Sequence, residues 1–115
     1  MRHRLGYRKL NRPTDQRLAM FRSQSISLIK HGKIKTTVTR AKELRKMADK
    51  LVSLAKLNSL HARRRVFALL RNKEAVKTLF DMVGRFEGRP GGFTRIIKLG
   101  LRRGDAVQMA QIEWS

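Results

Sequence analysis

Apolar residues recur every three or four positions through the middle of the chain, which is the spacing of an amphipathic helix. The clearest stripe consists of Ala41, Leu44, Ala48, Leu51 and Ala55. Lysines and other polar residues occupy most of the positions between them. The pattern predicts a helix that is capped by Thr39, buries one face and ends near Asn58.

Three further helices are predicted from apolar stripes and from residues that start or stop helices. An apolar stripe before Gly32 predicts a first helix over residues 15–31. Ser59 and Asn72 are typical N-caps, because their side-chain oxygens accept hydrogen bonds from free backbone N–H groups. They predict a third helix that reaches about Leu70 and a fourth that ends before Gly84.

Short runs of β-branched and other apolar residues predict three strands, over residues 34–38, 93–99 and 106–114. Three glycines and a proline predict a loop over residues 85–92, and residues 100–105 are expected to form the turn of a hairpin. An isolated hairpin is marginal in water. We therefore expect it to pack on the helices and to recruit the first strand.

These elements predict an α/β fold in one small domain, with helices packed on a small mixed three-stranded sheet in the order α-β-α-α-α-β-β. A chain of 115 residues has room for one domain with one core. The globular body is expected to cover residues 13–115. Residues 1–12 hold five cations, no acid and no sustained helical pattern, so they are predicted to form an extended basic arm.

The charge of the chain points to a polyanionic partner. There are 28 Lys and Arg against 8 Asp and Glu, a formal net charge of +20. Nucleic acid would relieve the repulsion between these cations and release its own condensed counterions. Residues 1–50 carry a net +12 and residues 51–115 a net +8, so the folded surface is expected to meet the partner together with the arm.

RNA is favoured over DNA because several cations lie beside groups that stack on unpaired bases. His3 and Tyr7 lie in the arm, and Phe93 stands two residues before Arg95. For Tyr7, stacking on RNA and packing against the core remain equal alternatives. Phe93 opens a predicted strand, so it is expected to pack in the core.

Two groups of arginines in the predicted body are candidates for phosphate binding. Residues 63–65 are three consecutive arginines that span most of a helical turn, so at least two must be exposed. Arg102 and Arg103 lie at the tip of the predicted hairpin. The full set of candidate RNA-binding residues is Arg2, His3, Arg4, Tyr7, Arg8, Lys9, Arg12, Arg17, Arg22, Lys35, Arg63, Arg64, Arg95, Arg102 and Arg103.

Catalysis, a metal site, a cofactor and a small-molecule substrate are not expected. The three histidines are 28 and 30 residues apart, and there is no cysteine. The glycines match neither a phosphate-binding loop nor a dinucleotide fingerprint. Four acids have a cation three or four residues away on a predicted helix and are expected to form surface ion pairs: Glu43, Asp49, Glu74 and Asp81.

Other cellular roles are less well supported by the sequence. No apolar run approaches the roughly 20 residues that cross a bilayer, and the absence of cysteine fits the cytosol. The arginine-rich arm shares features with a mitochondrial presequence but contains no serine. A DNA-binding helix-turn-helix that uses the third helix is the alternative function, although base-reading polar residues are sparse there.

Several short segments stand in a characteristic order along the chain. They are Met-Arg-His-Arg at the start, Leu10-Asn11-Arg12, Ile34-Lys35-Thr36-Thr37 and Ala41-Lys42-Glu43-Leu44-Arg45. A C-terminal block adds Gly91-Gly92-Phe93-Thr94-Arg95-Ile96, Lys98, Arg102, Gly104-Asp105, Met109-Ala110 and Ile112-Glu113. In these segments, and over essentially its whole length, the chain resembles the bacterial large-subunit ribosomal protein seventeen family.

The resemblance implies an α/β domain with three main helices and a small mixed sheet. It also implies a structural role on large-subunit ribosomal RNA, in the cytoplasm, beside neighbouring ribosomal proteins near the peptide exit tunnel. Because the resemblance begins at Met1, the arm is expected to belong to the mature protein. Trp114 is larger than the aliphatic residue usual in the family and is expected to cover the apolar side of the hairpin.

Overall fold

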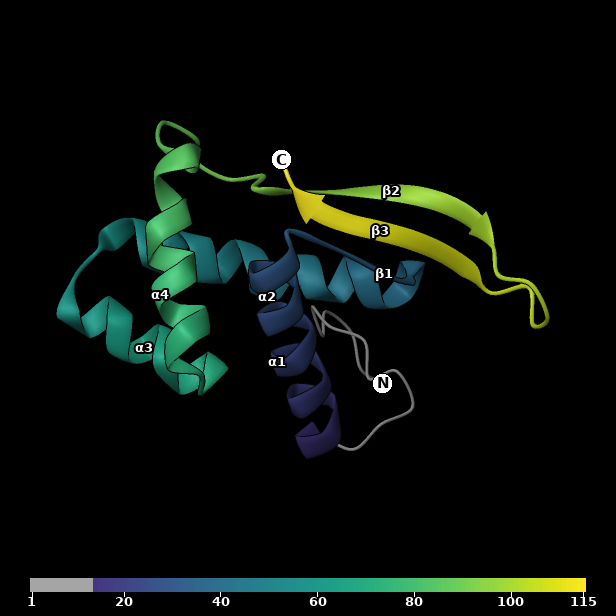
Figure 1. Ribbon diagram of the computed structural model, residues 1–115, viewed down its shortest axis with the longest axis horizontal. Helices are drawn as coiled ribbons and strands as arrows, with labels where there is room; N and C mark the ends of the chain where they lie inside the picture. Colours follow the sequence, from purple (N-terminus) through teal and green to yellow (C-terminus); the bar gives the residue numbers. More distant parts are fainter. Residues whose placement is uncertain (1–13) are drawn as a thin grey trace, which may run out of the picture.

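Four α-helices and a three-stranded sheet make up the computed structural model, which describes residues 14–115 (Figure 1). The elements are α1 (Thr14–His31), β1 (Lys33–Thr37), α2 (Val38–Leu57), α3 (Leu60–Leu70), α4 (Lys73–Met82), the short 3-10 helix η1 (Val83–Phe86), β2 (Thr94–Leu101) and β3 (Gln108–Trp114). The predicted α/β class and element order are confirmed, with η1 added at the edge of the expected loop. The predicted basic arm lies outside the described residues.

The start of α2 differs from the prediction because a different threonine caps it. Thr37 has an extended backbone, and its hydroxyl accepts a hydrogen bond of 3.3 Å from the backbone N–H of Arg40. Val38 is therefore the first residue of the helix and not the last residue of β1. The predicted caps of α3 and α4 are confirmed, since Ser59 and Asn72 accept hydrogen bonds from the N–H groups three residues on.

The sheet has the strand order β1-β3-β2, and both pairings are antiparallel. A mixed sheet was expected, but the central strand β3 runs opposite to both neighbours, which leaves no parallel pair among the described strands. The registers place Ile34 and Ile96 on either side of Ile112. All three isoleucines belong to or pack against the core, so this face of the sheet lies against the helices and the recruitment of β1 is confirmed.

The hairpin turn lies two residues later than predicted. Gly100 is inside β2, where the pairing with β3 shifts between Lys98 and Gly100, so Leu99 is the extra residue of a β-bulge. Gly100 has a φ of +97°, which a residue with a side chain rarely adopts. The turn itself is closed by the backbone N–H of Arg102, which donates to the carbonyl of Val107 at 2.7 Å.

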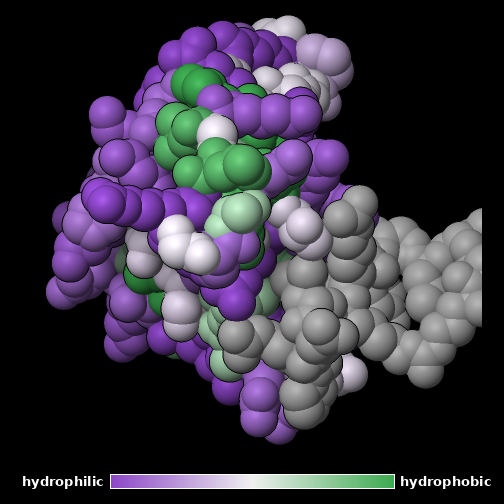
Figure 2. Space-filling model, turned by 90° about the vertical axis from the view of Figure 1, so that its right-hand side faces the viewer, coloured by the Kyte–Doolittle hydropathy of each residue, from purple (hydrophilic) through white to green (hydrophobic). Residues whose placement is uncertain are grey.

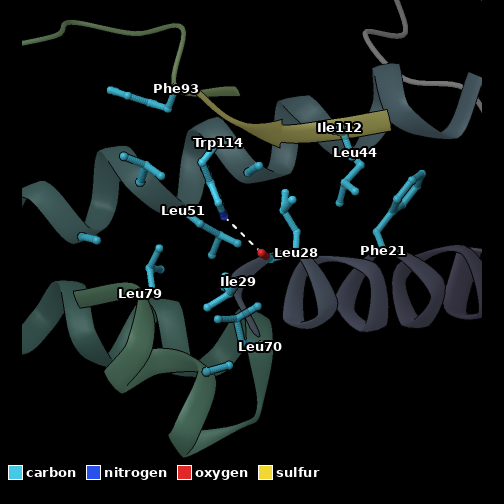
Figure 3. Packing of buried hydrophobic residues seen from close by; sticks show 14 of the residues in the cluster. Phe21, Leu28, Ile29, Leu44, Leu51, Leu70, Leu79, Phe93, Ile112 and Trp114 are labelled. Atoms are coloured by element: carbon cyan, nitrogen blue, oxygen red, sulfur yellow. Dashed lines mark hydrogen bonds between the residues drawn. The ribbon is translucent and has the colours of Figure 1, made fainter. Parts of the chain in front are cut away.

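Three aromatic rings join the end of the chain to the helical layer. The ring of Phe86 lies 5.4 Å from that of Phe93 and 5.8 Å from that of Trp114, between centroids. Figure 3 shows Trp114 reaching from β3 to α1, where its Nε1 donates a hydrogen bond of 3.1 Å to the carbonyl of Leu28. Phe93 is 1% exposed, which confirms its predicted place in the core.

Candidate nucleic-acid interface

The three consecutive arginines of α3 are all exposed, which confirms the prediction that at least two would be. The helix buries Ala62, Val66 and Leu70 on one side and contains no acidic residue that could neutralise the other side. The guanidinium of Arg63 lies 4.4 Å from the ring centroid of Phe80 on α4. Its Nη2 also donates to the Oδ1 of Asn58 at 3.4 Å. Arg63 is therefore held in a defined orientation at the surface.

A shallow hollow lies between α3 and α4, which pack side by side at the end of the molecule opposite the hairpin turn (Figure 1). The hollow has a volume of about 320 Å³, and its lining residues are Arg63, Arg64, Phe67, Lys73 and Val76. Three of these five are cations, and Phe67 is 42% exposed. We call this site the α3–α4 hollow.

A second basic site lies between α2 and β2 and was not foreseen from the sequence. It is a groove of about 500 Å³ lined by Val38, Lys42, Arg45, Lys46, Asp49, Ile96 and Lys98. Lys42, Arg45 and Lys46 share one side of α2 because residues three and four apart face the same way. Lys98 comes from the same face of β2 as Ile96. This α2–β2 groove brings together four cations around one acid.

Asp49 is the acid in the α2–β2 groove, and it is half-buried instead of lying in a surface ion pair. Its burial raises the pKa of the carboxyl, and the charge of Arg45 and the neighbouring groups of Phe93 and Thr94 partly offset that rise. The carboxylate is therefore less favourable in the folded protein than in water. It lowers the positive charge of the groove without cancelling it.

Glu43 forms the predicted ion pair with a cation three residues away, Lys46, but its carboxylate is buried and not at the surface. It is 7% exposed, and both of its carboxylate oxygens lie 3.3 Å from the Nζ of Lys46. It lines the space between α1 and α2 together with Arg17, which is likewise 7% exposed. Because α2 is covered by α1 as well as by the sheet, positions outside its main apolar stripe are buried too.

At the hairpin tip, Arg102 forms an ion pair with Asp105 within the turn. Its Nε donates to the Oδ1 of Asp105 at 3.0 Å, and its Nη2 bonds the Oδ2 of the same carboxylate. These hydrogen bonds lower the pKa of Asp105 to about 2 and raise the pKa of Arg102. Arg102 thus fastens the turn, whereas the neighbouring Arg103 is exposed at the tip. Figure 2 looks at this end and shows a hydrophobic area bordered by hydrophilic side chains.

The other predicted site residues are spread over the described surface. The Nε of Arg22 donates to the carbonyl of Leu69 at 3.1 Å and so links α1 to α3. Arg95 pairs with Glu113 at 2.6 Å across the outer face of the sheet, where Lys35 is also exposed. The fold thus brings Arg63 and Arg64 together but separates them from the sheet residues. The candidates outside the described residues are Arg2, His3, Arg4, Tyr7, Arg8, Lys9 and Arg12.

The described residues lack the signatures of a membrane span and of a metal cluster. Within residues 14–115, no helix combines the length and the apolar character that a membrane crossing requires. Over the same residues, His, Cys, Asp and Glu side chains do not gather in groups of three or more that could hold a metal ion.

Residues 20–115 match the sequence profile of the family described as Ribosomal protein L17. The chain belongs to this family. A large ribosomal subunit protein bL17 from Dictyoglomus thermophilum is 53% identical over 114 residues, which cover 98% of both chains. The bL17 protein from Desulforapulum autotrophicum is 56% identical, with 98% of this chain and 95% of the relative covered. The family assignment confirms the resemblance found in the sequence and makes the chain a ribosomal protein.

Proposed function

We propose that this protein is a structural constituent of the large ribosomal subunit in the cytoplasm, where it binds and stabilises large-subunit ribosomal RNA by neutralising phosphates. Family membership supports the ribosomal part of this proposal, because the relatives are named as large-subunit proteins. It also favours ribosomal RNA over the DNA-binding alternative. Neighbouring large-subunit proteins near the peptide exit tunnel are further partners that the family resemblance implies.

The observation that carries the proposal is the convergence of four cations in the α2–β2 groove. Lys42 and Arg45 project from α2, and Lys98 faces them from β2. Lys46 lies beside them with its Nζ paired to Glu43. Side chains from two elements of one rigid core can meet the phosphates of a nucleic-acid backbone at fixed spacing. Each neutralised phosphate releases counterions, which favours binding and makes it sensitive to salt.

Cations outside the groove extend the RNA-binding surface over several sides of the protein. Arg64 and Lys73 lie at the α3–α4 hollow, and Arg103 is exposed at the hairpin tip. We assign the basic arm, residues 1–12, to the same function because it contains five cations and no acid. A protein that meets RNA on several sides is expected to join RNA segments that are distant in sequence.

The test is RNA binding by the full chain with the groove cations removed. The double variant Lys42→Gln, Lys98→Gln should bind large-subunit RNA more weakly and reduce the slope of log affinity against log salt. The slope should fall by an amount on the order of 0.7 to 0.9 for each phosphate that the variant no longer neutralises. Lys77→Gln is the control for the loss of a lysine charge elsewhere on the surface. Lys77 is exposed on α4 and lines neither basic site. If the double variant kept the affinity and the salt slope of the unchanged protein, the α2–β2 groove would not be a site of phosphate binding.

A further inference from the structure

Phe67 is an exposed aromatic ring in a strongly basic surface. It is 42% exposed on α3, although phenylalanine is normally among the most buried residue types. The core-facing stripe of α3 is already complete without it, because Ala62, Val66 and Leu70 are at most 1% exposed. Phe67 is therefore directed away from the core and towards the α3–α4 hollow that it lines.

The α3–α4 hollow combines an apolar floor with a cationic rim. Phe67 and Val76 supply the apolar surface, and Arg63, Arg64 and Lys73 supply the charge. Among the described residues no acid lines the hollow, and the nearby Glu74 instead lines a separate depression beside α1. A volume of about 320 Å³ lies within the range of small-ligand sites. The site therefore suits a flat apolar group joined to an anion.

An unpaired nucleotide has this combination of groups, because it carries an aromatic base and a phosphate on each side. Aromatic side chains commonly stack on unpaired RNA bases, whose faces are hidden in a duplex. Arg63 is already held by Phe80 and Asn58, so it forms a fixed wall of the site. Arg64 and Lys73 are exposed and can reach the flanking phosphates.

We propose that Phe67 stacks on an unpaired base of RNA while Arg64 and Lys73 bind the phosphates beside it. The site then selects single-stranded RNA over duplex RNA, which phosphate neutralisation alone does not do. This inference rests on the proposed RNA-binding function and adds the class of RNA that this part of the surface recognises.

The experiment uses the full chain with two RNAs of equal length, one single-stranded and one fully paired. Phe67→Leu removes the ring but keeps an apolar side chain, and Phe67→Trp exchanges the ring for another aromatic ring. Arg64→Gln removes charge only. Leu60→Ala is the control, because Leu60 is 64% exposed on the same helix and does not line the hollow. Fluorescence of an aminopurine base in the single strand reports stacking directly.

Phe67→Leu should weaken binding of the single strand on the order of tenfold, abolish the quenching of aminopurine and leave duplex binding and the salt slope unchanged. Phe67→Trp should retain both the binding of the single strand and the quenching of aminopurine. Arg64→Gln should weaken both RNAs and lower the salt slope. If Phe67→Leu changes neither RNA while Arg64→Gln weakens both, stacking is overturned and phosphate binding stands. If neither variant changes binding, the hollow is not an RNA site and both assignments to it fail.

Discussion

The indole of Trp114 and the carbonyl of Leu28 are joined by a buried hydrogen bond of 3.1 Å across 86 positions of the chain. The bond fastens β3 to the end of α1 (Figure 3). Trp114 also packs on Phe86. The sheet contributes Lys98 to the α2–β2 groove, so the position of the sheet on the helices determines the shape of that groove.

Trp114→Phe should lower the free energy of unfolding by about 0.5 to 1.5 kcal/mol, because it removes the indole hydrogen bond to the Leu28 carbonyl, which then keeps only its hydrogen bond of 2.8 Å from the backbone N–H of Gly32. Urea unfolding followed by circular dichroism measures the loss. Leu57→Ala, at a side chain that is 70% exposed, is the control and should change stability by no more than about 0.5 kcal/mol. Equal stability of Trp114→Phe and the unchanged protein would contradict the role of this bond.

Thr37→Ala should lower the free energy of unfolding by about 0.5 to 2 kcal/mol, because the hydroxyl of Thr37 caps α2. Thr39→Ala provides a matched control, since Thr39 lies two residues later and inside the helix. Thermal unfolding of the two variants compares them directly. A larger loss of stability for Thr39→Ala would show that Thr39, the cap predicted from the sequence, is the residue that caps α2.

The contrast between Thr37 and Thr39 shows where sequence patterns suffice and where they do not. Both threonines can cap a helix, and the choice follows from β1, whose pairing with β3 ends at Thr37 opposite Met109. That pairing joins segments far apart in the sequence, so local propensity cannot decide it. The other helices were predicted well because their caps and apolar stripes are local signals. Gly100 was predicted to lie in the hairpin turn, but it lies in β2, because glycine is equally typical of a turn and of a β-bulge.

The candidate site likewise contains residues that local sequence patterns could predict and residues that they could not. The exposure of Arg63 and Arg64 could be predicted because three adjacent cations cannot all be buried on one helix. The α2–β2 groove could not be predicted, because Lys98 meets Lys42 only after the sheet docks on α2. The spacing of the cations on α2 was the one local sign of that groove. Arg102 was expected to face RNA, but its pairing with Asp105 depends on the geometry of the turn.

Asp49→Asn should stabilise the protein at neutral pH. Burial raises the pKa of Asp49 in the folded state, so the folded protein binds the proton more readily than the unfolded chain does. Stability therefore falls as pH rises through the interval between the unfolded and folded pKa values, and the cost persists at neutral pH. Melting temperatures of both proteins across the acidic range should show a gain at pH 7 that shrinks below about pH 4. A lower melting temperature for Asp49→Asn at pH 7 would contradict this assignment.

Asp105→Asn should have the opposite pH dependence. Its ion pair with Arg102 lowers the pKa of Asp105 to about 2, so the carboxylate stabilises the folded state above its ordinary pKa near 4. That contribution is lost as pH falls towards 2. The unchanged protein should therefore be more stable than Asp105→Asn at pH 7, and the two should converge in acid. Parallel pH profiles of the two melting temperatures would show that the ion pair does not form in solution.

The most direct test of the proposed function is co-sedimentation of the full chain with large ribosomal subunits that lack their own copy of this protein. We expect the chain to bind the subunits and to remain bound through a salt wash that releases the Lys42→Gln, Lys98→Gln variant. The steep salt dependence of phosphate binding is the reason for that difference. A chain that stays in the supernatant at low salt, or a variant retained as firmly as the unchanged protein, would contradict the account.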